Sequence, residues 1–198
     1  MPAEASAAEG YGLLLVPEPP MVRTIFFAEG GKQRLVFPYT MFGLFYFRNA
    51  NFQYSLKRLH VMFSQTPFTG EREDKLYGLP LRNHDGAFAT CFYQWDGEQT
   101  AEKFAHLIIN QYWMSPYAEY HDWASWWTGR YQALNPTFAK EWADASARKD
   151  YQWIFDQTLL QPDHHVTLGR LLDANKAHTK QGGVEVLQLD VPKTEIKF

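Results

Sequence analysis

Residues 41–47 read MFGLFYF, a run in which every side chain except that of Gly43 is large and apolar. A half-buried strand alternates apolar with polar residues, so this nearly continuous run predicts a strand that is covered on both faces. Further segments rich in strand-forming residues span 13–16, 21–27, 33–39 and 56–63. Proline and glycine turns separate them, and we expect consecutive strands to form an antiparallel β-meander of about five or six strands.

The character of the sequence changes near residue 96. Asp96 and Gln99 have the spacing of a capping box, which predicts that a helix begins there. Helical spacing follows over residues 104–112, and an aromatic stripe favours a helix over residues 120–134. Asn135 and Pro136 are typical of a helix start. Two more helical segments are expected over residues 151–160 and about 166–177.

These patterns predict an α+β fold in which strands come first and helices second. We divide the chain into an extended arm at residues 1–10, a single domain at 11–180 and an extended C-terminal tail at 181–198. Within the domain, residues 11–95 are expected to be mainly β and residues 96–180 mainly α. Residues 64–85 are expected to form a long loop, of the kind that is commonly functional or held by a partner.

Composition excludes several classes of protein. The chain has 198 residues, a net charge of -3, 17% aromatic residues and one cysteine, Cys91. A disulfide framework within the chain and a cysteine-rich zinc site are therefore excluded. The charge offers no basic field for nucleic acid, and no apolar stretch is long enough to span a membrane. The first residues lack the basic and apolar regions of a signal peptide, so we expect a virion or cytoplasmic location without secretion by a signal peptide.

Motifs for nucleotide binding and for a nucleophile elbow are missing from the sequence, and we expect no cofactor. Two histidine clusters, at His121 and at His164 and His165, are weak candidates for metal binding because each stands beside carboxylates. Neither cluster has the ligand spacing of a known metal motif. A metal-dependent hydrolase that uses these three histidines remains an alternative. Cys91 lies in an apolar segment, where burial would make its thiol inert.

The stretch LPLRNHDGAFA at residues 79–89 follows the predicted strands and precedes the predicted helices. This order resembles ubiquitin-conjugating E2-like domains, whose loop carries a His-Pro-Asn tripeptide, then a Gly and shortly after it the catalytic Cys. Here residues 81–83 keep only Asn83 of the tripeptide, and Ala89 stands at the Cys position. The resemblance implies a four-stranded meander flanked by helices, without thioester chemistry, and hence an inactive adaptor domain as a second alternative.

The C-terminal tail contains β-forming residues that we predict to contact a partner protein by adding a strand to its sheet. The residues predicted for this contact are Val184, Val186, Leu187, Leu189 and Val191. The alternative is that both tails fold back onto their own domain. Together with the aromatic excess and the lack of catalytic motifs, the tails favour a non-enzymatic structural subunit of a large protein assembly. We expect a phage-type virion component (capsid, connector or tail) that contacts other protein subunits, with homo-oligomers as one form.

Overall fold

A computed structural model describes residues 9–26, 31–78, 96–98, 100–115, 138–159, 166–176, 183–187 and 189. A β-rich N-terminal region is followed by helices, which confirms the predicted α+β class. The strands are β1 (Gly10–Glu18), β2 (Met21–Phe26), β3 (Lys32–Phe37), β4 (Tyr39–Arg48), β5 (Tyr54–Ser64), β6 (Lys75–Leu76), β7 (Asp96–Glu98), β8 (Val166–Thr167) and β9 (Val184–Val186). The helices are α1 (Ala101–Met114), α3 (Phe138–Arg148), α4 (Tyr151–Leu159) and α5 (Leu168–Ala174).

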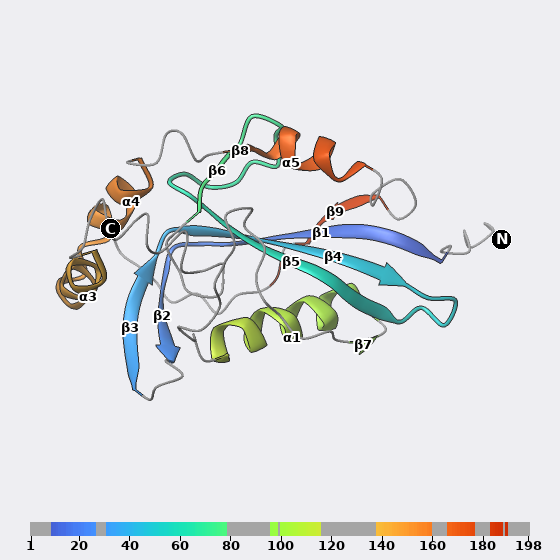
Figure 1. Ribbon diagram of the computed structural model, residues 1–198, viewed down its shortest axis with the longest axis horizontal. Helices are drawn as coiled ribbons and strands as arrows, with labels where there is room; N and C mark the ends of the chain where they lie inside the picture. The colour runs from blue at the N-terminus through green and yellow to red at the C-terminus, as the bar shows by residue number, and fades with distance from the viewer. Residues whose placement is uncertain are drawn as a thin grey trace, which may run out of the picture.

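The main sheet has five strands in the order β7-β5-β4-β1-β9, and its long central strands are seen in Figure 1. Strand β4 contains the MFGLFYF run and lies between β1 and β5, with antiparallel neighbours on both sides. Its residues alternate between two cores: Phe42 and Leu44 belong to one, Met41 and Phe45 to the other. The prediction of a strand covered on both faces is therefore confirmed.

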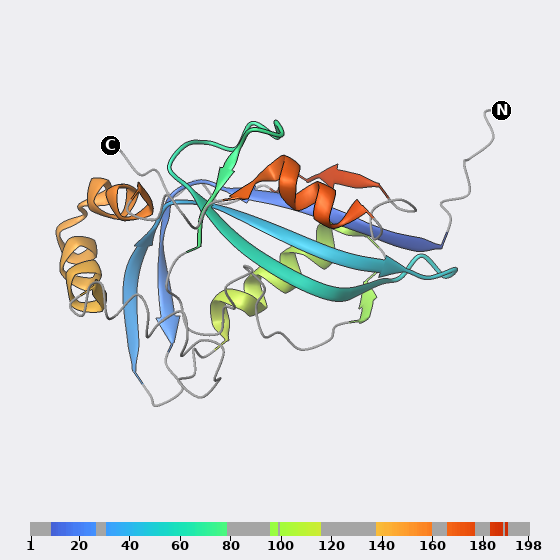
Figure 2. The same cartoon turned by 45° about the horizontal axis from the view of Figure 1, so that its top comes forward.

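Helices cover both faces of the main sheet, as the two views in Figure 1 and Figure 2 show. Helix α1 contributes Phe104 and Ile108, both fully buried, to the core on one face. Helix α5 contributes Leu168 and Leu171 to the smaller core on the other face. The residues that enter each core follow the strict alternation of a strand, so the sequence of β4 specifies a sheet with one helix on each side.

Strands β2 and β3 form a separate antiparallel hairpin that extends away from the main sheet. Helix α3 packs against the outer edge of β3. The indole Nε1 of Trp142 donates to the carbonyl oxygen of Val36 at 2.8 Å, and the main-chain N–H of Val36 donates to Oγ of Ser146 at 3.0 Å. The hairpin lies between β1 and β4 in the sequence. Strand β1 pairs with β4, which comes after the hairpin, and not with β2, which directly follows β1.

The starts of two helices differ from the sequence prediction. Helix α1 begins at Ala101, and its N-cap is Thr100, whose side chain accepts a hydrogen bond from the main-chain N–H of Lys103 at 3.3 Å. The prediction of a cap at Asp96 is wrong because Asp96 belongs to β7, which pairs with the start of β5. Helix α5 likewise begins at Leu168, with Thr167 as its cap. In the first case a long-range strand pairing prevailed over a local capping signal.

Candidate functional site

Strand β9 lies at one edge of the main sheet and runs parallel to β1. The main-chain N–H of Leu13 donates to the carbonyl oxygen of Gly183 at 3.2 Å, and the N–H of Leu187 donates to Leu15 at 2.9 Å. In a parallel ladder, every second residue directs its main-chain groups to the same neighbour. Since Gly183 and Leu187 face β1, the main-chain groups of Val184 and Val186 point away from the sheet.

The side chains of β9 complete this edge. Val184 and Val186 are 42% and 48% exposed, and the register places them beside Leu13 and Leu15, on the face that α5 covers. Glu185 is exposed and lies beside Leu14, on the face that α1 covers. The edge therefore combines outward main-chain hydrogen-bonding groups with two exposed apolar side chains and one carboxylate.

The residues of the predicted partner contact fall into three groups. Val184 and Val186 lie at the exposed edge, whereas Leu187 and Leu189 are partly buried against the core beneath α1. Val191 lies beyond the described residues. The tail pairs with β1 of its own chain, which is the alternative that the sequence left open, and contact of its outer edge with a partner stays a prediction.

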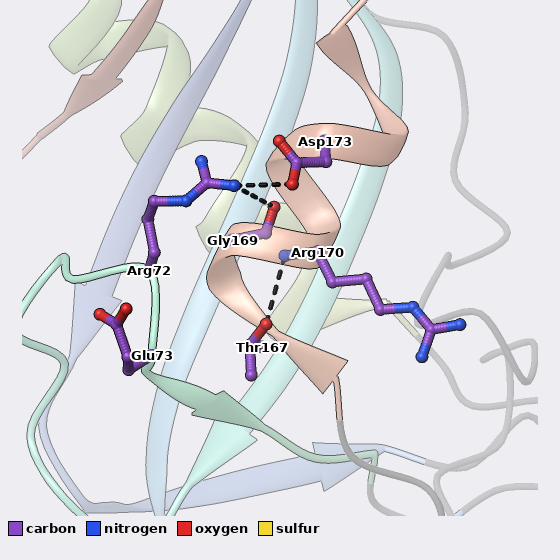
Figure 3. Close-up of a pocket in the computed structure, with 6 residues that line it drawn as sticks. All are labelled: Arg72, Glu73, Thr167, Gly169, Arg170 and Asp173. Atoms are coloured by element: carbon purple, nitrogen blue, oxygen red, sulfur yellow. Dashed lines mark hydrogen bonds and ion pairs between the residues drawn. The ribbon is translucent and has the colours of Figure 1, made fainter.

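A pocket of about 380 Å³ opens between the turn before β6 and the start of α5 (Figure 3). Its main cation is already paired: the guanidinium of Arg72 contacts the carboxylate of Asp173 at 2.6 Å and the carbonyl oxygen of Gly169 at 3.3 Å. Hydrogen bonds from Lys176 and Arg72 lower the pKa of Asp173 below its ordinary value. The ion pair between Arg72 and Asp173 joins the turn before β6 to helix α5.

A buried polar cluster lies where β1 turns into β2. The carboxylate of Glu18 is 5% exposed and contacts the guanidinium of Arg23 at 2.7 Å. The indole Nε1 of Trp113, on α1, donates to the same carboxylate at 3.3 Å, and Arg23 lies 4.9 Å from the centre of the Trp113 ring. Burial raises the pKa of Glu18, while Arg23 and Trp113 oppose the rise. No motif in the sequence points to these residues, although Glu18 stands between two prolines at the end of a strand, which is a visible signal.

The candidates for catalysis lie largely outside the described residues. His121, His164, His165 and Cys91 belong to segments that the structure does not describe. Among the residues that it describes, no three His, Cys, Asp or Glu side chains gather as a metal site. No helix within these same residues is both long and apolar enough to cross a membrane.

The loop that resembles E2-like domains, with Asn83 and Ala89, also falls in a segment that is not described. The resemblance implied a meander of four consecutive strands. The main sheet instead has the order β7-β5-β4-β1-β9, in which the β2–β3 hairpin stands apart. The strand order therefore gives this resemblance no support.

Comparison with known proteins gives no relative from which a function can be inferred: no protein family, no curated protein and no solved structure matches the chain.

Proposed function

We propose that this protein is a non-enzymatic subunit of a protein assembly, in which the outer edge of β9 receives a strand from a neighbouring subunit. The observation that carries the proposal is the outward direction of the main-chain groups of Val184 and Val186, beside two exposed valine side chains. In strand addition the main-chain hydrogen bonds provide affinity and the alternate side chains provide specificity.

The exposure of this edge supports the proposal. Edge strands that must stay free are commonly blunted by a short length, by charged side chains, by proline, by a bulge or by a covering helix. Strand β9 is three residues long and carries the charged Glu185, and it has no proline. Strand β9 presents valines at both of its outward positions, and within the described part of the chain no strand pairs with its outer side. An apolar edge of this kind favours association with another strand. The phage-type virion setting stays a prediction of the sequence, as do the inactive E2-like adaptor and the metal-dependent hydrolase.

Replacement of Val186 by proline tests the proposal. Proline lacks a main-chain N–H, and the N–H of residue 186 points away from β1, so V186P removes an outward donor and leaves the β1–β9 hydrogen bonds in place. We expect the wild type to form oligomers in size-exclusion chromatography with light scattering, and V186P to run as a folded monomer.

The matched control is V186T, which keeps the N–H and the shape of the side chain. We expect V186T to assemble like the wild type, because main-chain hydrogen bonds carry the contact. A wild type that stays a monomer at every concentration, with its C-terminal segment resistant to protease, would rule the proposal out.

A further inference from the structure

The β2–β3 hairpin has a second strand edge, on the outer side of β3. The main-chain groups of Val36 face away from β2, since they bond to Ser146 and Trp142 of α3. Residues of an antiparallel strand alternate in the direction of these groups. Lys32 and Arg34 therefore also direct their main-chain groups outward, and within the described residues no main-chain partner meets them.

The two edges carry opposite charges. Lys32 and Arg34 are exposed on β3, and Glu185 is exposed on β9. None of the three forms an ion pair with another described side chain, so all three charges are open to a partner, as are other exposed charges such as Lys57 and Glu71. Two residues of β3, Lys32 and Arg34, have outward main-chain groups that α3 does not bind, and β9 has two, Val184 and Val186. The open parts of the two edges therefore match in length, and the two cations of one edge are opposite in charge to the single carboxylate of the other.

Pairing of β9 with β9 of a second copy is disfavoured by charge. In a two-fold antiparallel pair, residues with outward main-chain groups lie opposite one another. The register in which both outward valines of each copy are paired places Val184 opposite Val186 of the second copy. Glu185 would then lie directly opposite Glu185 of that copy. Like charges in this position destabilise a pair of strands. A neighbour that presents a basic strand avoids this repulsion. Lysine on an edge strand commonly discourages pairing, and Glu185 would offset that effect at the edge of β3, where Lys32 and Arg34 lie.

Parallel pairing of β9 with β3 removes the conflict. In a parallel ladder, a residue whose main-chain groups face the neighbour lies opposite one whose groups face away. Val184 and Val186 would lie opposite odd-numbered residues of β3, and Glu185 would lie opposite Lys32 or Arg34. We propose that β3 of one copy adds in parallel to β9 of the next, so that the chain assembles head to tail. This inference rests on the proposed function and names the partner of the same edge.

A head-to-tail contact uses two different surfaces and therefore generates a ring or a filament instead of a closed two-fold dimer. Charge reversal provides the test. We expect E185K alone and K32E/R34E alone each to weaken assembly by about tenfold in dissociation constant, because each replaces attraction with repulsion across the strands. Matched controls are E71K and K57E/R58E, which change the net charge equally at exposed positions away from both edges.

Mixing the two variants gives the decisive result. The reversed β9 of E185K complements the reversed β3 of K32E/R34E, and the unchanged edges also complement each other. An equimolar mixture should therefore form a filament, or a ring with an even number of copies, as readily as the wild type, with the two variants alternating. Light scattering gives the mass, and negative-stain microscopy distinguishes a ring or filament from a dimer. Restoration in the mixture also shows that neither variant is misfolded.

The outcomes separate this inference from the function on which it rests. If V186P abolishes assembly but the charge variants assemble like the wild type, or the mixture is not restored, β9 is the contact and β3 is not its partner. A two-fold dimer that neither charge reversal weakens would likewise show that β3 is not the partner of β9. A wild type that remains a monomer removes the proposed function itself.

Discussion

At the scale of single residues, the Glu18 cluster makes a prediction about pH. Burial raises the pKa of Glu18 above its ordinary value of 4.5, so the folded chain binds this proton more tightly than the unfolded chain does. Protonated Glu18 therefore stabilises the fold below that value. The contribution is lost as the pH rises through the raised pKa of the folded state.

The neutral variant E18Q should lack this pH dependence. From about pH 4 to about pH 7, we expect the unfolding free energy of E18Q to rise relative to that of the wild type, as measured by urea unfolding at each pH. The same substitution at exposed Glu71 serves as the control. If the unfolding free energy of E18Q relative to the wild type stays constant or falls with pH, then Arg23 and Trp113 lower the pKa of Glu18 by at least as much as burial raises it.

Removal of Arg23 should lower the unfolding free energy relative to the wild type as the pH rises, which is the opposite of the trend expected for E18Q. The variant R23M leaves the buried carboxylate of Glu18 without its ion-pair partner, and loss of one partner from a buried pair costs about 3–5 kcal/mol. Because Arg23 is 24% exposed, we expect a loss near the lower end, about 3 kcal/mol near pH 7. Below the pKa of Glu18 the loss should shrink, because the carboxyl is then neutral. Chemical unfolding near pH 7 and at a pH below the pKa of Glu18 measures this loss of unfolding free energy.

Gly12 offers a second prediction at this scale. It lies opposite Tyr46 in the β1–β4 pair, and a Cβ at this position would lie 2.9 Å from Cε1 of the Tyr46 ring. Since Tyr46 is 6% exposed, its ring has little room to move. We expect G12A to lower the unfolding free energy by about 1–3 kcal/mol. In a Y46A background the same change should cost close to nothing, and equal costs in both backgrounds would contradict the contact.

At the scale of elements, the sequence was most informative where the pattern is local. The strand at residues 41–47 and the helical spacing of residues 104–112 both appear where the sequence predicts them. Pairings between distant segments were not accessible, because a local pattern does not encode its partner. The parallel contact of β9 with β1 and the contact of β1 with β4 are of this kind. The valines of β9 were singled out, but the outward direction of their main-chain groups follows from the register alone.

The contact of α3 with β3 is an element-scale prediction. Ser146 accepts the hydrogen bond from the main-chain N–H of Val36, a residue that is fully buried. The variant S146A leaves this donor unpaired, which should cost about 1–3 kcal/mol of stability. Hydrogen exchange at Val36 should accelerate in S146A and stay slow in S146T, which keeps the hydroxyl. An unchanged exchange rate in S146A would show that the hydroxyl of Ser146 does not protect the main-chain N–H of Val36.

At the scale of the whole molecule, most aromatic residues that the structure describes are buried or partly buried. Phe37, Phe42, Phe63 and Phe104 are fully buried, and Phe37 contacts both Trp113 and Trp142 edge-on. Among the aromatic residues whose burial the structure describes, Tyr11, Phe26 and Phe52 are exposed. The buried aromatic residues belong mostly to the core beneath α1, whereas Phe45 is the one aromatic among the buried residues of the described core beneath α5. Assembly is therefore proposed through the sheet edges and not through an aromatic surface.

The most direct test of the account is amide hydrogen exchange at β9 in concentrated and dilute protein. If a neighbouring strand pairs with this edge, the amides of Val184 and Val186 become protected on assembly, because their N–H groups enter hydrogen bonds with that strand. The amide of Leu187, which already donates to Leu15, should change little. Assembled protein in which Val184 and Val186 exchange as fast as in the dilute monomer would contradict the account.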